Sequence, residues 1–575
     1  MLDIITDNLD VWTTAKKNKK AVGRGSSKKQ EAYGVKKLRE LILELAVRGK
    51  LVPQDDSDEP ASVLLDRIAE EKTRLIEERK IRKFKELPKI NKQDELWPLP
   101  QGWAFVRFGN ATFNRDAERI PLSVAERSGR QGEYDYYGTS GVIDTIDKYL
   151  FEKELLLIGE DGANLINRST PIAFMARGKY WVNNHAHVID GISEGLLLYI
   201  CLHINAISLE QYVTGTAQPK MNQTKMNSII LALPPLAEQH RIVAKVNELM
   251  ALCDQLEQQQ SDQSATHQTL VETLLNGLIE SAKTSANDQQ STADFFNQLI
   301  AQHFDTLFTT DQSIDQLKQT ILQLAVMGKL VPQDPKDEPA SVLLEKIAEE
   351  KIRLIEAGKI KKQKALPEIG EDEKPFELPN GWEWIRLFDI SELITSGSRG
   401  WAKYYSDQGA IFVTMGNLAR DSYELRMDTI RYVSPPSGGE GSRTELIEND
   451  LVISITGDVG NLGLIPQNFG EAYINQHACL LRFLPDCRNY YWPEFMRSPL
   501  AKLQFNAPQR GIKNSFRLGD IGGMVASMPP LAEQHRIATK VNQLLTLCDT
   551  LKANLNQAQT TQTQLADAIV KQAVN

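Results

Sequence analysis

The chain has 575 residues, of which 41% are hydrophobic and 25% charged, a globular composition with room for roughly three or four domains. Its formal net charge of −9 excludes a protein that binds nucleic acid through an overall basic charge. The first residues hold no apolar run after a basic start, and no run of about 18 apolar residues occurs. These two observations exclude a signal peptide and a membrane span, and they predict a cytoplasmic protein.

The N-terminal segment, residues 1–34, is basic. Between positions 16 and 29, lysines and an arginine are interrupted by glycine and serine. Such a run is typically solvated, and its charges can also contact phosphates. We therefore predict a flexible basic tail.

Two stretches of the chain occur twice. Residues 42–88 recur at 321–367 with 35 of 47 positions identical, and residues 234–256 recur at 529–551 with 17 of 23 identical. The chain enclosed by these copies shows little similarity between its two occurrences. A duplicated frame that carries two unlike inserts predicts an internal pseudo-twofold repeat and two different recognised targets.

The repeats set the predicted domain boundaries. In chain order, the parts are the basic tail at 1–34, the first helical frame at 35–88, the first insert at 89–233, a central spacer helix and joint at 234–313, the second helical frame at 314–367, the second insert at 368–528 and a C-terminal spacer helix at 529–575. Neither insert is basic: residues 101–233 hold 12 Lys and Arg against 14 Asp and Glu, and residues 381–528 hold 14 against 16. Any DNA contact must therefore come from a local concentration of charge or from a partner.

Each frame opens with two predicted helices, described here for the first copy. The apolar spacing over 35–47 predicts a helix that ends at Gly49, because glycine accepts the left-handed conformation that follows a helix. The acidic residues before Pro60 predict the start of a second helix. In that helix, Glu70-Glu71-Lys72 is interpreted as a solvated face.

The inserts mix short β-like runs, at 155–159, 451–455 and 478–483, with Gly and Asn turns. This pattern predicts small α+β domains.

A long helix follows each insert. Apolar and small residues recur at 4-3-4-3 spacing from Ile242 to Leu274 and from Ile537 to Ile569, the pattern of a coiled-coil seam. At about 1.5 Å per residue, the second helix would form a rod of roughly 64 Å. We predict that the two helices pack antiparallel and hold the inserts apart, because a single helix with a polar centre is marginal in water.

Several blocks of the sequence are distinctive. They are LAVRGKLVPQ and LAVMGKLVPQ, the two DEPASVLL segments, the LPxGW motifs at Leu99–Trp103 and Leu378–Trp382, and the two PPLAEQHRI segments. In these blocks the chain resembles the specificity subunits of type I restriction-modification enzymes. Within the inserts the resemblance is looser and rests on Gly159-Glu160-Asp161-Gly162 with Asn183-Asn184-His185-Ala186, and on Gly457-Asp458-Val459-Gly460 with Asn475-Gln476-His477-Ala478.

The resemblance implies an α+β fold of two globular target-recognition domains, separated by two long helices packed as an antiparallel coiled coil. It implies a non-catalytic subunit that reads a bipartite, asymmetric site on double-stranded DNA, one half per domain. Two modification subunits with methyltransferase activity would dock on the frames, and restriction subunits with ATP-dependent translocase and nuclease activity would join them. S-adenosylmethionine, ATP and magnesium would serve those partners, and no cofactor is expected on this chain.

Motifs for catalysis are missing from the sequence. It contains neither a G-x-x-x-x-G-K-[ST] loop for ATP nor an Asn/Asp-Pro-Pro-aromatic motif that holds a flipped base. A self-sufficient nuclease or methyltransferase is therefore not supported. His185 and His187 alternate as on one face of a strand, but no third metal ligand is visible, which favours a hydrogen-bonded structural role.

Base reading requires Arg or Lys for guanine and Asn or Gln for adenine, while hydroxyls and backbone amides bind phosphate. Polar loops with these groups lie at 214–225, 395–405 and 509–515, and an ordinary exposed loop is the competing interpretation of each. The predicted DNA-binding residues are Arg168, Arg177, Lys179, Gln218, Lys220, Asn222, Lys225, Ser396, Arg399, Lys403, Tyr404, Gln509, Arg510, Lys513 and Asn514.

A duplicated protein-interaction scaffold without DNA specificity is the alternative function. The acidic balance of both inserts favours it. The salt dependence of binding separates the two, because phosphate contacts release counterions and give a steep log–log slope.

Overall fold

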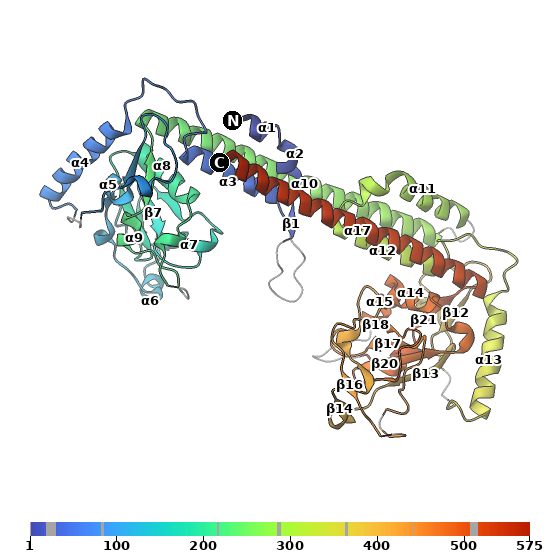
Figure 1. Cartoon of the computed structure of the whole chain (residues 1–575). Helices are drawn as coiled ribbons and strands as arrows, with labels where there is room; N and C mark the ends of the chain where they lie inside the picture. Colours follow the sequence, from blue (N-terminus) through green and yellow to red (C-terminus); the bar gives the residue numbers. More distant parts are fainter. Residues whose placement is uncertain are drawn as a thin grey trace. The chain divides into compact units, whose positions relative to one another are not determined.

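The computed structural model describes residues 2–18, 30–81, 86–215, 218–284, 289–362, 366–436, 438–439, 441–506 and 516–574. The chain divides into two compact units (Figure 1). Unit 1 comprises Met1–Gln263 and Gln557–Asn575, and unit 2 comprises Ser264–Asn556. No helix in the described ranges is both long enough and apolar enough to cross a membrane.

Unit 1 contains the first frame and the first insert. Its elements are α1 (Leu2–Thr6), α2 (Leu9–Thr14), β1 (Lys17–Asn18), β2 (Gln30–Glu31), α3 (Tyr33–Val47), α4 (Ala61–Glu77), η1 (Lys92–Asp94), β3 (Ala104–Arg107), α5 (Phe108–Ala111), β4 (Phe113–Asn114), η2 (Asp116–Glu118), α6 (Val124–Ser128), β5 (Tyr134–Gly138), β6 (Gly141–Ile146), β7 (Leu155–Gly159), α7 (Asn164–Asn167), β8 (Ala173–Ala176), β9 (Tyr180–Val182), β10 (Ala186–Asp190), α8 (Glu194–Ala206), η3 (Glu210–Tyr212), α9 (Gln223–Asn227), β11 (Ile230–Leu233), the first part of α10 (Leu236–Thr284) and the last part of α17 (Leu531–Val574).

Unit 2 contains the second frame and the second insert. Its elements are the last part of α10, α11 (Gln289–Leu307), α12 (Asp311–Val326), α13 (Ala340–Glu356), η4 (Glu371–Glu373), β12 (Glu383–Arg386), β13 (Ser391–Ser396), η5 (Gly400–Tyr404), β14 (Tyr405–Ser406), β15 (Ala410–Val413), η6 (Met415–Asn417), β16 (Tyr432–Val433), β17 (Leu451–Ser454), β18 (Leu462–Leu464), β19 (Ala472–Ile474), β20 (Ala478–Phe483), η7 (Pro485–Cys487), α14 (Tyr491–Arg497), α15 (Pro499–Asn506), α16 (Leu518–Gly522), β21 (Val525–Met528) and the first part of α17.

The two inserts share the strand order of one sheet although their sequences differ, while their second sheets have three strands (β6-β5-β9) and four strands (β14-β16-β15-β19). The first has a four-stranded sheet in the order β4-β10-β7-β8, and the second has β13-β20-β17-β18. In each, a second sheet contains a parallel pair, β5 with β9 or β15 with β19, whose later strand leads directly into the four-stranded sheet. The predicted α+β class is confirmed, and the predicted strand runs at 155–159 and 478–483 are β7 and β20.

An antiparallel strand pair closes each insert. Strand β3 pairs with β11 in the first insert, and β12 pairs with β21 in the second. These pairs bring the start and the end of each insert together next to its frame. The insert can therefore vary in sequence while its two ends keep the same attachment.

The same buried contact joins frame and insert in both units. In unit 1, Trp103 Nε1 donates to Glu238 Oε2 at 2.9 Å. In unit 2, Trp382 Nε1 donates to Glu533 Oε2 at 3.0 Å. The helix-ending Gly49 has a φ of +67°, and a Cβ there would lie 2.9 Å from the Trp103 ring. Glycine is thus required both by the turn and by the tryptophan that follows it.

The long helices α10 and α17 pack on each other in an antiparallel sense, as predicted (Figure 1). In unit 1 the first part of α10 shares a core with the last part of α17, through Cys253 and Ala566 among others. In unit 2 the last part of α10 shares a core with the first part of α17, through Val271 and Val541 among others.

The predicted 4-3-4-3 seam shifts by one residue in both helices. In α17, Leu565 is exposed and Ala566 is buried, and in α10, Leu270 is exposed and Val271 is buried. In α17, Ala566 lies eleven residues after Leu555, and in α10, Val271 lies eleven residues after Gln260. An eleven-residue step corresponds to about 3.67 residues per turn, close to a straight helix, so the strict heptad register does not persist.

In each unit a third helix contacts α10 and α17: it is α3 in unit 1 and α12 in unit 2. The sequence predicts both as frame helices and does not predict what they pack against. In unit 1, Arg39 of α3 forms an ion pair with Asp254 of α10 at 2.6 Å, and Tyr33 Oη donates to Asp567 of α17 at 2.9 Å. In unit 2, Gln316 of α12 donates to Glu272 of α10 at 2.8 Å, and Lys318 forms an ion pair with Asp549 of α17. Each unit is thus built on three helices, which in unit 1 are far apart in the sequence.

The N-terminal segment differs from the predicted flexible tail. Residues 2–14 form α1 and α2, and Trp12 is fully buried with its Nε1 donating to Ile5 O at 3.1 Å. The reason is that Val11 and Trp12 pack into the core of unit 1, which the basic residues that follow concealed in the sequence. Most of the basic run, residues 19–29, lies outside the described residues.

Lys72 corrects the interpretation of Glu70-Glu71-Lys72 as a solvated face. Its side chain is buried and its Nζ donates to Gly109 O and to Thr112 O, the latter at 3.0 Å. Lys351, at the same position of the repeat, donates to Phe388 O at 2.5 Å. Both lysines attach the second frame helix, α4 or α13, to carbonyls at the start of the insert.

Candidate nucleic-acid interface

The predicted polar loop of the first insert is held against the segment Gly159–Gly162. Thr214 and Lys220 exchange backbone hydrogen bonds of 2.9 and 2.8 Å. Gly162 N donates to Pro219 O at 2.9 Å, and Met221 N donates to Glu160 O at 2.8 Å. Residues 216 and 217 lie outside the described residues. Two segments that are distant in the sequence thus form one surface.

The predicted DNA-binding residues of this loop differ in whether their polar side-chain groups already have a partner within the protein. Gln218 is exposed, and Lys220 is exposed with its Nζ 3.2 Å from Glu160 Oε1. Asn222 caps helix α9, because its side chain accepts from Lys225 N at 2.9 Å. The DNA role of these four residues stays a prediction.

A group of ion-paired side chains contacts the loop from the interior of the insert. His187 Nδ1 lies 2.7 Å from Asp116 Oδ2, and its Nε2 donates to Met221 O at 2.9 Å. Burial opposes protonation of this imidazole, but the hydrogen bond with Asp116 and the nearby charge of Glu160 outweigh it, so the pKa of His187 is raised. Arg119 also contacts Glu160, at 3.1 Å. The charged groups beneath the loop are therefore paired with one another.

His185 and His187 have different environments. His187 is buried in the group just described, whereas His185 is half exposed with its Nδ1 2.7 Å from Asp161 Oδ2. No group of three or more His, Cys, Asp and Glu side chains placed to hold a metal ion is found in the part of the chain that the structure describes.

Three predicted residues of the first insert are engaged within the protein. Arg168 donates to Ile204 O and Ile207 O, at 3.3 and 2.7 Å, around the end of α8, and burial lowers the pKa of its guanidinium. Arg177 pairs with Glu194 at 2.5 Å, and Lys179 lies 3.6 Å from Glu152. Arg168 therefore has a structural role as a cap of α8. For Arg177 and Lys179, a phosphate would have to compete with carboxylates.

In the second insert, the predicted residues lie around η5. Ser396 ends β13, Arg399 and Lys403 are exposed, and Lys403 Nζ lies 4.9 Å from the centre of the Tyr404 ring. Trp401, between them, is buried against Phe412 and Tyr473 and anchors the loop. The other four predicted residues, Gln509, Arg510, Lys513 and Asn514, lie outside the described residues.

The structure brings forward a feature that the candidate residues missed: the turn before β10 and its equivalent before β20. In the first, His185 N donates to Asn183 Oδ1 at 2.8 Å, and in the second, His477 N donates to Asn475 Oδ1 at 3.0 Å. The shared pattern Asn-x-His-Ala was the signal for it in the sequence. The turn places one further amide side chain, Asn184 or Gln476, between the two.

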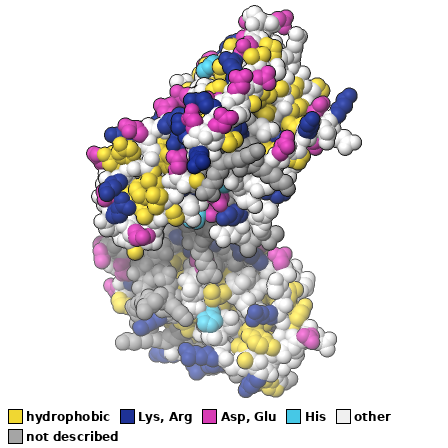
Figure 2. All heavy atoms as spheres, turned by 90° about the vertical axis from the view of Figure 1, so that its left-hand side faces the viewer, with side chains coloured by type: hydrophobic (Ala, Val, Ile, Leu, Met, Phe, Trp, Pro, Cys, Tyr) yellow, Lys and Arg dark blue, Asp and Glu magenta, His cyan; other side chains and the backbone are white. Residues whose placement is uncertain are grey.

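Both signs of charge occur on the face of the molecule that Figure 2 shows. Lys and Arg side chains lie interspersed with Asp and Glu in the upper part of this view. This agrees with the slightly acidic count of each insert. A DNA interface here must rely on local loops rather than on a broad basic field.

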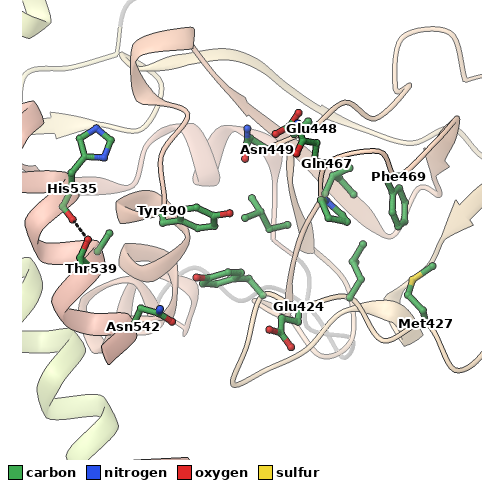
Figure 3. Close-up of a pocket in the computed structure, with 16 residues that line it drawn as sticks. Glu424, Met427, Glu448, Asn449, Gln467, Phe469, Tyr490, His535, Thr539 and Asn542 are labelled. Atoms are coloured by element: carbon green, nitrogen blue, oxygen red, sulfur yellow. Dashed lines mark hydrogen bonds between the residues drawn. The ribbon is translucent and has the colours of Figure 1, made fainter. Parts of the chain in front are cut away.

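Unit 2 also contains a pocket of about 790 Å³ between loops of the second insert and α17 (Figure 3). Glu424 and Glu448 line it, together with Tyr490 and His535, and none of its 16 lining residues is Lys or Arg. Because its carboxylates would repel phosphate, we leave this pocket out of the candidate DNA interface.

Comparison with known proteins identifies the class of these inserts and frames. Residues 116–264 match the family model described as the type I restriction modification DNA specificity domain. The chain is 37% identical to the type I restriction enzyme EcoEI specificity subunit of Escherichia coli, over 100% of this chain and 99% of that protein. It is 36% identical to the EcoAI specificity subunit of the same organism, again over 100% and 99%. The chain therefore belongs to the family of type I restriction enzyme specificity subunits.

Solved structures show weaker likeness. The crystal structure of the HsdS subunit from Thermoanaerobacter tengcongensis shares 16% identity, with 83% of this chain and 98% of that chain covered and a TM-score of 0.38. We base the family assignment on the full-length sequence relatives alone.

Proposed function

We propose that this chain is the non-catalytic DNA-reading subunit of a type I restriction-modification complex, in which each insert reads one half of a bipartite, asymmetric site. The observation that carries the proposal is the full-length likeness to two specificity subunits. Near-identical frames with inserts that share the strand order of one sheet and differ in sequence support the assignment of one half-site to each insert.

The frames are the proposed docking surfaces for two modification subunits, and restriction subunits join the complex. The repeated second frame helix gives both units the same local surface, as two copies of one partner require, and the repeated buried Trp–Glu contact fixes the insert in the same way beside it. S-adenosylmethionine, ATP and magnesium serve those partners in this proposal, in keeping with a sequence that contains no G-x-x-x-x-G-K-[ST] loop for ATP.

An insert exchange tests the division of labour. The segment from β3 to β11 is replaced by that of a relative with another target, and the methylated sites of cells that carry the complex are mapped by sequencing. We expect one half of the site to change and the other to stay, because the closing strand pair preserves the attachment of the insert. A reciprocal exchange from β12 to β21 is the control and should change only the other half. If both halves or neither changed, the assignment of one half-site to each insert would be wrong.

The acidic balance of the inserts favours one competitor, a protein-interaction scaffold without DNA specificity. Binding of the assembled complex to a duplex that contains its site is measured between about 50 and 200 mM salt. The DNA-reading function predicts a fall of affinity of roughly 10³-fold or more for about six phosphate contacts. Affinity that is independent of salt and of sequence would support the scaffold instead.

A further inference from the structure

The turn that precedes β10 in the first insert is equivalent to the turn that precedes β20 in the second. In both, the chain leaves the parallel strand pair of one sheet and enters the centre of the four-stranded sheet. The backbone of the histidine is held in the same way, since Glu160 N donates to His185 O at 2.9 Å and Ile455 N donates to His477 O at 3.0 Å. Two inserts of unlike sequence thus keep one turn geometry.

In the first insert, the turn offers unpaired polar groups. Asn184 is exposed, and its side chain has no hydrogen-bond partner among the residues that the structure describes. His185 Nδ1 is fixed by Asp161 at 2.7 Å while 49% of its side chain is exposed. The aspartate therefore orients the ring, and the Nε2 edge remains available to a ligand.

In the second insert, the histidine is occupied and the amide is the available group. His477 Nδ1 lies 2.8 Å from Thr456 Oγ1, and its Nε2 accepts from Gln476 Nε2 at 2.9 Å. The ring thereby positions the Gln476 amide, whose oxygen and second N–H are not used in this contact. His477 is a positioning residue for Gln476.

The predicted polar loops lie beside these turns. Lys220 forms an isolated bridge with Asp161, the partner of His185. In the second insert, Ser398 forms an isolated bridge with Asn475, and Arg399 follows it in the chain. Each turn is therefore flanked by a cation, the exposed Arg399 in the second insert and, in the first, Lys220, for which a phosphate would have to compete with Glu160 at 3.2 Å.

From these observations we infer that the two turns are the equivalent base-reading elements of the inserts, with Asn184 and Gln476 each contacting an adenine in its half of the site. A carboxamide that donates and accepts side by side matches the N6 and N7 edge of adenine in the major groove. His185 adds a second contact in the first half-site. This inference rests on the proposed DNA-reading function and names the residues that carry it out.

The test uses the whole complex with its modification subunits and duplexes in which each position of the site is randomised in turn. Discrimination is measured as the ratio of methylation rates at each position. We expect Asn184→Ala to lower discrimination at one adenine of one half-site by roughly 5- to 150-fold, and Gln476→Ala to do the same in the other half. Each variant is the internal control for the other half-site. Melting temperatures should not change, because Asn184 is exposed and Gln476 is partly exposed.

Two further variants distinguish a loss of base discrimination at one position from a general loss of methylation activity. Gln467→Ala, at the acidic pocket of the same insert, should leave every position unchanged. His477→Ala should lower discrimination at the position affected by Gln476→Ala, and the double variant should lose no more than Gln476→Ala alone, since both act on one contact. Unchanged discrimination in both Asn184→Ala and Gln476→Ala, with a native complex that methylates a bipartite site, would overturn this inference. A native complex without a bipartite site would instead overturn the proposed function.

Discussion

At the scale of single residues, the frame depends on a carboxylate buried between repeated partners. Glu533 accepts from Trp382 at 3.0 Å and from Gln333 at 3.2 Å, and it is almost fully buried. Burial raises its pKa to about 7, against the hydrogen bonds that lower it. Burial likewise raises the pKa of Glu238, the matching residue of the first frame. Neutral pH therefore lies close to the pKa of Glu533.

The change Glu533→Gln tests this carboxylate. Because the folded pKa lies above the unfolded value, the native protein should lose stability as pH rises from about 4.5 to 7, by roughly 2–3 kcal/mol in unit 2. The variant cannot ionise, and Gln333 can turn its amide to accept from the new one, so the variant should be the more stable protein at about pH 8 and about equal near pH 4.5. Denaturant unfolding at the two pH values measures the difference. A variant that is less stable under the alkaline condition would show that the ionised carboxylate is the favoured form.

At the scale of elements, a lysine of the second frame helix contacts the start of the insert, in addition to a backbone hydrogen bond of 2.8 Å from Ala61 N to Gly102 O or from Ala340 N to Gly381 O. Lys72 of α4 places its ammonium against two carbonyls in a buried position, and burial lowers its pKa to about 8. Its repeat partner, Lys351 of α13, contacts the Phe388 carbonyl and is half buried. A lysine thus attaches the second frame helix in both units, and the lysine of unit 1 is the more deeply buried of the two.

Replacing Lys72 by Met keeps the length of the side chain and removes the donor. We expect a loss of about 1–3 kcal/mol in the stability of unit 1, because buried carbonyls of Gly109 and Thr112 lose a hydrogen bond. Lys351→Met should cost less, and Lys346→Met, in an exposed ion pair of α13, should cost almost nothing. Hydrogen exchange of α4 and α13 reports the order of these effects. Equal losses for Lys72→Met and Lys346→Met would contradict the attachment.

At the scale of the whole molecule, α17 serves both units. Its last part belongs to unit 1, where Ala566 and Ala573 are buried and Asp567 accepts from Tyr33. The start of α10 and the end of α17 therefore depend on each other although about 300 residues separate them in the chain.

Deletion of residues 557–575 should consequently destabilise unit 1 and spare unit 2. The deletion exposes the apolar face of α3 and of the first part of α10, so we expect amide exchange in unit 1 to rise roughly tenfold or more. Unit 2 keeps all of its residues and should keep its protection. Asp567→Ala in the full chain is the control for the polar contact alone and should have only a small effect, about 1 kcal/mol or less. Equal loosening of both units would contradict the division.

The sequence by itself determined the duplication and the long antiparallel helices. These follow from near-identical copies and from helical periodicity, which can be read along the chain. It also marked the loop at 214–225, because a cluster of Lys, Asn and Gln is visible without coordinates. Each of these signals lies within one stretch of chain or in the comparison of two stretches, so none depends on how the chain folds back on itself.

Only the tertiary structure decided which polar groups are free. The sequence predicts Arg168 as a DNA contact and Lys72 as solvated, whereas in the fold Arg168 caps α8 and Lys72 is buried. The sheet order that the inserts share was likewise hidden, because strand pairing joins residues that are distant in the chain, whereas the match of Asn184 with Gln476 is visible in the shared Asn-x-His-Ala pattern. Side-chain availability depends on these long-range partners, and periodicity and composition carry no information about them.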